Sequence, residues 1–506
     1  MRRLKGEDNS FLAWESAVQP QHTVKAVVLD PKKVSEPFDF DRFKEVVQAW
    51  AARVEPMQWQ LLSPRAGVGR PWWVSRPRLD MNYHVHRTTA AAPGGDEQLA
   101  ATIGELFEVP LDRDRPAWQI WYVEGLADGK VALVLKIHHA VADGGASVRL
   151  LENIYSADPD APLPAACPAP EDEQRPAATT WLPQVGRVQL TSWGRFPSLL
   201  GRTAHVTSVI RARQKSGKPG YAEAFTAPAM PFNDPLTAGR TFAYRRVDVN
   251  EIKRVAKAFG VTVNDVFLSL CAGALREYLQ SHGKLSDDAL TAVVPVSMRP
   301  KDTEVEWGNH VARWNVEFAT HIADPVERLQ AIADGTRTAR EVQAERDESL
   351  QHDWMEYWPL FWVYSRVLPI AGARVSKRPM FSLIASNMRG PKQLYLGGAP
   401  IEQLISTGPL VFPMGLNFTG WSYENEMTIC VLACSDHISE AYDIADHLPE
   451  MLAELGKLAP GATDETPAAA AETSAAADEI EEPKKRAPAN KAAAKKATPK
   501  AASGTA

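Results

Sequence analysis

The chain has 506 residues, enough for two or three domains rather than one. Its last 46 residues, 461–506, contain 17 alanines, no aromatic residue and Ile480 as the only other apolar side chain, so we predict a disordered tail. Because the tail holds seven acidic and seven basic residues, the body keeps the whole net charge of −6, with 49 basic and 55 acidic residues. A body of that sign argues against a general nucleic-acid-binding protein.

Cysteine content and hydropathy restrict the cellular compartment. Four cysteines without a pairing pattern are too few for a disulfide scaffold. The basic N-terminus lacks the apolar stretch of a signal peptide, and no run of 18 apolar residues predicts a membrane-spanning helix. These features predict a cytoplasmic protein, or one that contacts the inner membrane or lipid droplets peripherally.

Hydrophobic periodicity predicts two α/β series joined by a helical crossover. In the first series we predict strands at 24–30, 119–125 and 131–137, and helices at 40–53, near 99–107 and from 144 to about 155. A segment rich in Pro and Ala at 157–184 and a helical stretch at 185–214 follow. In the second series we predict strands at 240–248, 291–297, 311–319, 382–386 and 427–434, and helices at 250–259, 262–281, 324–346 and 350–368.

These elements predict four parts of the chain. They are an N-terminal domain at 1–160, a crossover with a helical segment at 161–239, a second α/β domain at 240–460 and the tail at 461–506.

The strongest local signal is the sequence His138-His139-Ala-Val-Ala-Asp143-Gly144. It follows a predicted strand and precedes a predicted helix, a position where catalytic groups often lie. An imidazole there can act as a general base near neutral pH, and the Asp143 carboxylate can orient a ring or pair with an arginine. A polar turn that merely contains two histidines is the structural alternative.

This motif resembles the HHxxxDG signature of the CoA-dependent acyltransferases, which include chloramphenicol acetyltransferase, carnitine acyltransferases and peptide-synthetase condensation domains. Further segments, in order along the chain, resemble the bacterial wax ester synthase/diacylglycerol acyltransferases. They are residues 4–12 with Glu15 (LSPxDxxFLxxE), 110–118 (PLDxxRPLW, with Ala117 for Leu), Asn264-Asp265 (ND), 294–299 with Gly308-Asn309 (PVSxR and GN) and 386–391 (SNVPGP, with Met388-Arg389 for Val-Pro).

The resemblance implies an α/β fold of two chloramphenicol-acetyltransferase-like domains, with mixed sheets and an active-site tunnel between them. It implies O-acyl transfer from long-chain acyl-CoA, a substrate rather than a cofactor, to diacylglycerol or a fatty alcohol. His139 would take the proton of the acceptor hydroxyl, and no acyl-enzyme would form. His138 would be a packing or hydrogen-bonding residue, Asp143 would be structural with Arg299 as a partner, and Gly144 would allow the turn.

Asn264 and Asp265 have two interpretations. Thr262 can cap the helix that follows, with Asp265 completing a capping box. Alternatively, Asn264 in the first helical turn could face a developing oxyanion, a role that the resemblance favours.

An aromatic stripe lies further along the chain. Trp354, Trp358 and Trp362 fall at i, i+4 and i+8, which predicts a helix face that packs against the second domain, contacts lipid or lines an acyl tunnel.

We predict no metal site and no cofactor. Cys430, Cys434 and His437 lack a fourth ligand and are better interpreted as core residues, and His84 and His86 are interpreted as surface or packing residues.

Two other functions remain as alternatives. One is a condensation-type acyltransferase with a carrier-protein donor, although no carrier segment is recognisable. The other is a non-catalytic lipid-droplet binding protein, which would not need an intact HHxxxDG motif.

Overall fold

A computed structural model describes residues 2–63, 71–76, 78–165, 178–215, 222–297, 307–345, 349–355, 367, 370–371, 374 and 377–460. The chain divides into one compact unit, Met1–Ala462, and a second, Thr463–Ala506. Everything described below belongs to the first unit. The predicted tail lies outside the described residues, as does most of the predicted helix at 350–368.

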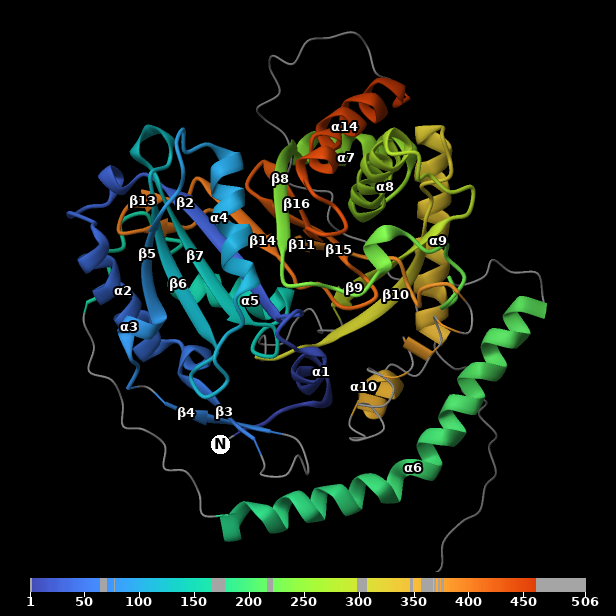
Figure 1. Ribbon diagram of the computed structural model, residues 1–506, viewed down its shortest axis with the longest axis horizontal. Coiled ribbons are helices and arrows are strands. Elements are labelled where there is room, and N and C mark those ends of the chain that lie inside the picture. The colour runs from blue at the N-terminus through green and yellow to red at the C-terminus, as the bar shows by residue number, and fades with distance from the viewer. Residues whose placement is uncertain are drawn as a thin grey trace, which may run out of the picture. The chain divides into compact units, whose positions relative to one another are not determined.

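The first sheet has five strands in the order β14-β2-β7-β6-β5 (Figure 1). They are β14 (Gln403–Thr407), β2 (His22–Leu29), β7 (Val131–His138), β6 (Trp118–Glu124) and β5 (Val85–Thr89). Strands β6 and β7, both predicted, are antiparallel neighbours. Its helices are α2 (Phe40–Arg53), α4 (Asp96–Glu108) and α5 (Gly144–Ile154), close to their predicted bounds.

The second sheet has six strands in the order β10-β9-β11-β15-β16-β8, both parallel and antiparallel. They are β10 (Val311–Phe318), β9 (Leu290–Ser297), β11 (Leu383–Arg389), β15 (Leu416–Tyr423), β16 (Glu426–Cys434) and β8 (Arg240–Asp248). A core of apolar residues joins it to α7 (Val249–Phe259), α8 (Val263–Ser281), α9 (Pro325–Glu345), α13 (Tyr442–Ala445) and α14 (His447–Leu458).

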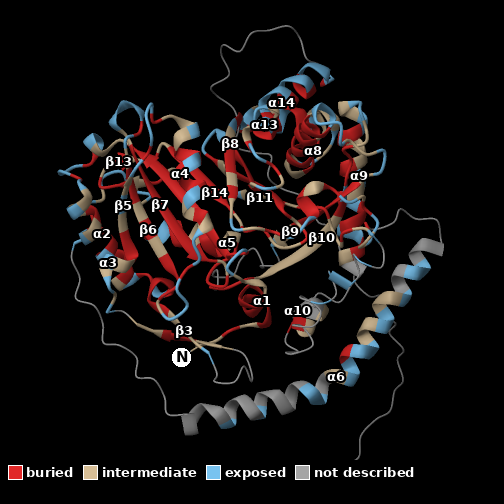
Figure 2. Cartoon of the chain, viewed as in Figure 1, coloured by how far each residue is buried: buried red, intermediate tan, exposed pale blue. Residues whose placement is uncertain are grey.

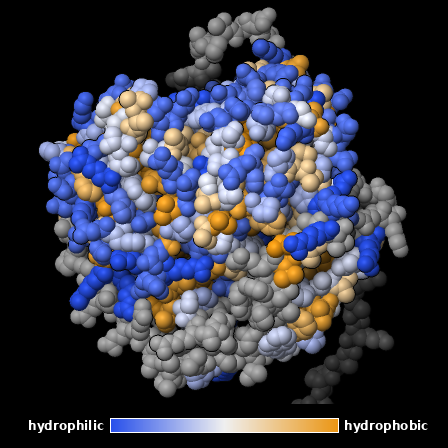
Figure 3. Space-filling model, in the orientation of Figure 1, coloured by the Kyte–Doolittle hydropathy of each residue, from blue (hydrophilic) through white to orange (hydrophobic). Residues whose placement is uncertain are grey.

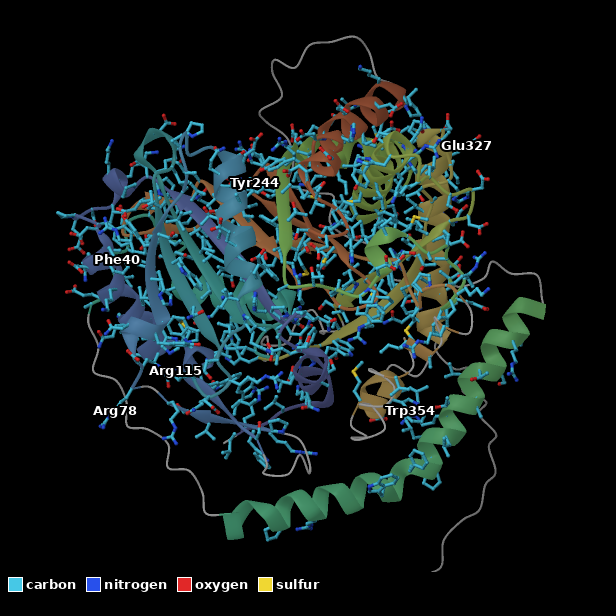
Figure 4. The ribbon with its side chains drawn as sticks, viewed as in Figure 1. Phe40, Arg78, Arg115, Tyr244, Glu327 and Trp354 are labelled. Atoms are coloured by element: carbon cyan, nitrogen blue, oxygen red, sulfur yellow. The ribbon has the colours of Figure 1, made fainter. Side chains whose placement is uncertain are left out.

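Helix α4 packs between the two sheets. Its residues Leu99, Ile103 and Phe107 share one buried cluster with β2 and β7 on one side and with β8 and β16 on the other. Tyr244 of β8 donates a hydrogen bond to Asp96 at the start of α4, with 3.0 Å between the oxygens (Figure 4). The periodic apolar positions that predicted this helix therefore hold the two halves together.

Strand β14 crosses from the second half of the chain into the first sheet. It pairs antiparallel with β2, so that Ser406 lies opposite Lys25 and Thr407 opposite Val24. The sequence analysis did not predict this strand. Figure 2 shows the central strands of the first sheet in red, and every residue of β2 and β7 is buried, as expected for strands covered on two faces.

The remaining elements lie outside the two large sheets. Short N-terminal elements are β1 (Arg2–Arg3), α1 (Gly6–Trp14), β3 (Trp59–Leu62), β4 (Trp72–Ser75) and α3 (Met81–His84). Of these, β1, β4 and β3 form a small sheet of their own. Two short strands, β12 (Tyr395–Leu396) and β13 (Ala399–Pro400), pair with each other. The crossover forms α6 (Ala178–Lys215), which contacts α10 (Ser349–Met355).

No single described helix is long and apolar enough to cross a bilayer. The bent pair of α7 and α8 passes that test by length and composition, and most of α8 is buried within the protein core. On the face drawn in Figure 3, hydrophilic and apolar residues are interspersed.

Candidate active site

A cavity of about 240 Å³ brings residues of both halves of the chain together. The first half contributes β2, the HHxxxDG segment and helix α1, and the second contributes β9, β10, β11, β15 and the segment that follows β14. The lining is mainly apolar, with Phe11, Val293, Ile384 and Trp421 among its side chains. Such a cavity suits a ligand that is largely hydrocarbon.

His139 lines this cavity at the end of β7. Its backbone N–H donates to the carbonyl of Gln21, just before β2, over 2.8 Å. The ring stacks on Phe11, with centroids 4.1 Å apart and planes 8° from parallel. Burial, followed by the positive charge of Lys25, lowers the pKa of His139 to about 4, so the imidazole is neutral at physiological pH.

Asn309 determines which ring nitrogen of His139 carries the proton. The Asn309 side-chain N–H₂ has two acceptors, Asp8 Oδ1 at 2.9 Å and the His139 carbonyl oxygen at 2.9 Å. Its Oδ1 therefore faces His139 Nδ1, 3.1 Å away, as an acceptor. Nδ1 must donate, which leaves the lone pair on Nε2 available to accept a proton.

Asp8 holds Asn309 in turn. The Asn309 backbone N–H donates to Asp8 Oδ1 over 2.7 Å, in addition to the side-chain bond. Burial raises the pKa of Asp8 to about 6, against the lowering effect of these bonds from Asn309. Both residues lie in segments that resemble family motifs, but the sequence analysis assigned neither of them a site role.

His138 points away from this arrangement. It is 2% exposed, and its Nδ1 accepts a hydrogen bond from the backbone N–H of Ala140 over 3.1 Å. Its Nε2 lies 3.3 Å from Glu15 Oε1. Burial alone would raise the pKa of Glu15, but His138 and Arg113 lower it to about 2. These contacts agree with the packing role predicted for His138.

Asp143 caps helix α5. Its Oδ1 accepts from the backbone N–H of Ala146 at 2.9 Å and its Oδ2 from that of His310 at 2.8 Å. The carboxylate therefore joins the HHxxxDG segment to the second half of the chain, beside the cavity. Arg299, its predicted partner, lies outside the described residues.

The reason predicted for Gly144 was wrong. Its backbone does not adopt the left-handed conformation that would favour glycine in a turn, and it forms the first residue of α5. Instead, a Cβ at this position would lie 2.5 Å from Met388 Sδ and 2.7 Å from Met388 Cε. Glycine is present here because β11 brings Met388 against the start of α5.

Asn264 and Asp265 do not join the other site residues. They begin α8, and neither lines the cavity. Thr262 and Asp265 form the predicted capping box, and Thr336 also donates to Asp265 over 2.6 Å. An oxyanion role for Asn264 therefore remains a prediction without support from the cavity.

The described residues contain no cluster of three or more His, Cys, Asp or Glu side chains that could hold a metal. Cys430 and Cys434 are fully buried in the cluster around α4. Trp354 packs against Phe196 of α6 and donates to Thr203 over 2.9 Å (Figure 4), whereas Trp358 and Trp362 lie outside the described residues.

Two such α/β halves around one cavity are the chloramphenicol-acetyltransferase-like fold that the sequence resemblance implied. In agreement, the first condensation domain of the calcium-dependent antibiotic synthetase has this fold, with a TM-score of 0.53 and 14% identity over 91% of this chain and 96% of that one. The wax ester synthase/diacylglycerol acyltransferase from Marinobacter aquaeolei VT8 gives a TM-score of 0.62 at 23% identity, over 90% of this chain and 99% of that one.

The chain belongs to the wax ester synthase/diacylglycerol acyltransferase family. The catalytic-domain model of that family matches residues 4–267, and its C-terminal-domain model matches residues 307–456. A provisionally named diacylglycerol O-acyltransferase of Mycobacterium tuberculosis (strain H37Rv) is 34% identical over 469 residues, 90% of each chain. The O-acyltransferase WSD of Acinetobacter baylyi is 28% identical over 458 residues, 89% of this chain and 96% of that protein.

These comparisons confirm the predicted family, fold class and acyltransferase class. They favour neither the carrier-protein-dependent enzyme nor the non-catalytic binding protein.

Proposed function

We propose that this protein transfers a long-chain acyl group from acyl-CoA to the hydroxyl of a diacylglycerol or a fatty alcohol, giving triacylglycerol or wax ester. The observation that carries this proposal is the neutral His139 at the cavity, with its Nδ1 held by Asn309. The names of the family and of its relatives supply the substrate classes.

The chemistry needs one base and no covalent intermediate. Nε2 of His139 takes the proton of the acceptor hydroxyl while the oxygen attacks the thioester carbonyl carbon. The tetrahedral intermediate then expels the CoA thiolate by breaking the C–S bond, and the proton on His139 passes to the thiolate sulfur. Asn309 keeps the ring oriented throughout, because its side-chain carbonyl accepts from Nδ1–H in both protonation states.

The apolar lining supports a lipid substrate. Burial of hydrocarbon contributes about 25 cal/mol for each Å² removed from water, so acyl chains gain affinity from such walls without specific polar contacts. No cofactor is required, because acyl-CoA supplies an activated thioester.

Helix α6 is the best candidate for contact with a lipid surface. Its 38 residues include five Arg and one Lys but no Asp or Glu, in a chain of net charge −6. Trp193 and Leu200 of this helix are 45% and 47% exposed. A basic helix with exposed apolar side chains favours an anionic bilayer or droplet surface.

An acyl-CoA assay with a panel of acceptors tests the proposed reaction. Thiol release and lipid product should appear together with diacylglycerol or long-chain alcohols, and His139→Ala should abolish both. Release of thiol without an ester product, or transfer only from a carrier-protein thioester, would refute the proposal.

Vesicle flotation tests the lipid contact. Trp193→Glu combined with Leu200→Glu should weaken binding to phosphatidylglycerol vesicles while leaving turnover of soluble acceptors unchanged. Val109→Glu is a matched control, because Val109 is 60% exposed on a different part of the chain. Equal binding by all three proteins would exclude α6 as the lipid-contacting element.

A further inference from the structure

A lysine lies inside the buried strand β2. All eight residues of this strand are buried, and Lys25 is 3% exposed. Val24, Ala26 and Val28 pack on one face against α4, so Lys25 lies on the opposite face, which borders the cavity. Removing an ammonium group from water costs several kcal/mol unless the site compensates for it. A lysine at this position therefore needs a reason beyond packing.

The side chain of Lys25 runs back along β2 toward His139. Its Nζ donates to Thr23 Oγ1 over 2.7 Å, two residues earlier on the same face. Thr23 is itself two positions, about 7 Å of extended strand, from Gln21, whose carbonyl binds the His139 N–H. Both Thr23 and Lys25 line the cavity that His139 lines.

The ammonium group of Lys25 has more N–H donors than the described residues provide acceptors for. Among the described residues, Thr23 provides the only hydrogen-bond acceptor for Nζ, and no carboxylate lies within ion-pairing distance. An ammonium carries three N–H donors. Ser406 lies opposite Lys25 on β14 and also lines the cavity, so the wall at this point is polar within a mainly apolar lining.

The proposed reaction creates a negative charge that needs a donor nearby. Attack on the thioester turns its carbonyl oxygen into an oxyanion, and groups already aimed at that oxygen stabilise the transition state. Asn264 and Asp265 do not line the cavity, so the oxyanion role predicted for Asn264 has no support there.

We infer that Lys25 is a further catalytic residue, whose ammonium group donates a hydrogen bond to the thioester oxyanion. This inference rests on the proposed acyl transfer. His139 accepts the proton of the acceptor, and the new C–O bond moves the carbonyl electron pair onto the oxygen that faces Nζ. When the C–S bond breaks, that electron pair re-forms the carbonyl. Lys25 keeps its proton throughout the reaction.

Burial and Asp143 determine the charge of Lys25. Burial is the larger influence and lowers the pKa of Lys25 to about 7, while the Asp143 carboxylate acts in the opposite direction. Arg313 and His139 are the other titratable groups among the described residues that line the same cavity. His139 is coupled to Lys25, because the positive charge of Lys25 contributes to its lowered pKa. The free enzyme therefore holds a charged lysine and a neutral histidine together between about pH 4 and about pH 7.

The test is the pH profile of kcat/KM for three proteins. The wild type should lose activity above about pH 7, as Lys25 loses its proton. Lys25→Met should lower kcat by about 10²–10³ with little change in the KM for acyl-CoA, because the interaction is made only in the transition state. That variant should lack the alkaline limb, and its acid limb should move to higher pH because His139 no longer has a cation beside it. Lys25→Arg keeps the charge at all accessible pH values and should lack the alkaline limb as well.

Several outcomes would overturn the inference without touching the proposed function. Lys25→Met with turnover within threefold of the wild type is one, provided that His139→Ala is inactive in the same assay. An alkaline limb that persists in Lys25→Arg is another, and it decides the question even if Lys25→Met fails to fold. A higher KM with an unchanged kcat would assign Lys25 to substrate binding instead. A loss of turnover confined to acceptors that carry a carboxylate would lead to the same assignment.

Discussion

The side-chain carbonyl of Asn309 lies 3.1 Å from Nδ1 of His139, and the Asn309 amide group is bound on its other side by Asp8. Asn309 comes from the second half of the chain, 170 positions after the histidine. The tautomer of the proposed base therefore depends on the docking of the two halves. Removal of Asn309 tests this dependence directly.

We expect Asn309→Ala to lower kcat by roughly tenfold to a hundredfold, part of the about 10²–10⁴ that a general base contributes. The ring would lose the acceptor that fixes its proton on Nδ1. Steady-state turnover with the Asn153→Ala variant as control measures the effect, because Asn153 is exposed and donates to the carbonyl of Arg149 in its own helix. Unchanged kcat in folded Asn309→Ala would show that the His139 orientation is fixed by other contacts, such as the Phe11 ring.

His139→Ala and His138→Ala should separate chemistry from stability. His139→Ala should lower turnover at least about a hundredfold while leaving acyl-CoA binding and the melting temperature nearly intact. His138→Ala should cost more in stability, because it leaves Glu15 buried without the ring beside it. Thermal unfolding and single-turnover assays on both proteins measure the two effects. Near-normal turnover by well-folded His139→Ala would contradict the base assignment.

The acid limb of kcat/KM should lie near pH 4. An unperturbed imidazole, with a pKa of about 6.5, would already lose its base function just below neutrality. Because burial and Lys25 lower the pKa of His139 to about 4, the ring stays neutral and able to accept a proton down to that range. The limb should be absent from the residual activity of His139→Ala. A limb near pH 6.5 would mean that the ring is more hydrated than its surroundings indicate.

Gly144→Ala should displace the flexible end of the Met388 side chain with only a small loss of stability, because the added methyl group overlaps that end. Met388 lines the cavity, so its displacement should also alter KM for long acyl chains. Gly144→Ala combined with Met388→Ala should recover much of the lost catalytic efficiency. If the double variant has the same low catalytic efficiency as Gly144→Ala, a contact other than Met388 requires glycine at this position.

Ending the chain at Pro460 should leave acyl transfer to a soluble acceptor unchanged. The apolar clusters are built from residues before this point, as is the cavity. Circular dichroism and turnover of the truncated protein measure the effect, with vesicle flotation as a separate readout for lipid contact by the tail. Loss of folded protein would show that the tail has a structural role.

The sequence by itself determined the local structure and the reaction class. The helix around Leu99–Phe107 and the strand at 240–248 follow from the spacing of apolar residues, which depends only on neighbours along the chain. The secondary structure of the HHxxxDG segment is also local, since a strand end and a helix that Asp143 caps follow from its own residues.

The tertiary structure alone decided which distant groups meet that segment. Strand β14 was not predicted, and its pairing with β2, about 380 positions earlier along the chain, exists only in the tertiary structure. The same reason applies to Asn309 and Asp8, whose hydrogen bonds to each other and to His139 exist only after the two halves dock. Met388 explains Gly144 in the same way, because only the packing of β11 against α5 removes the space for a Cβ.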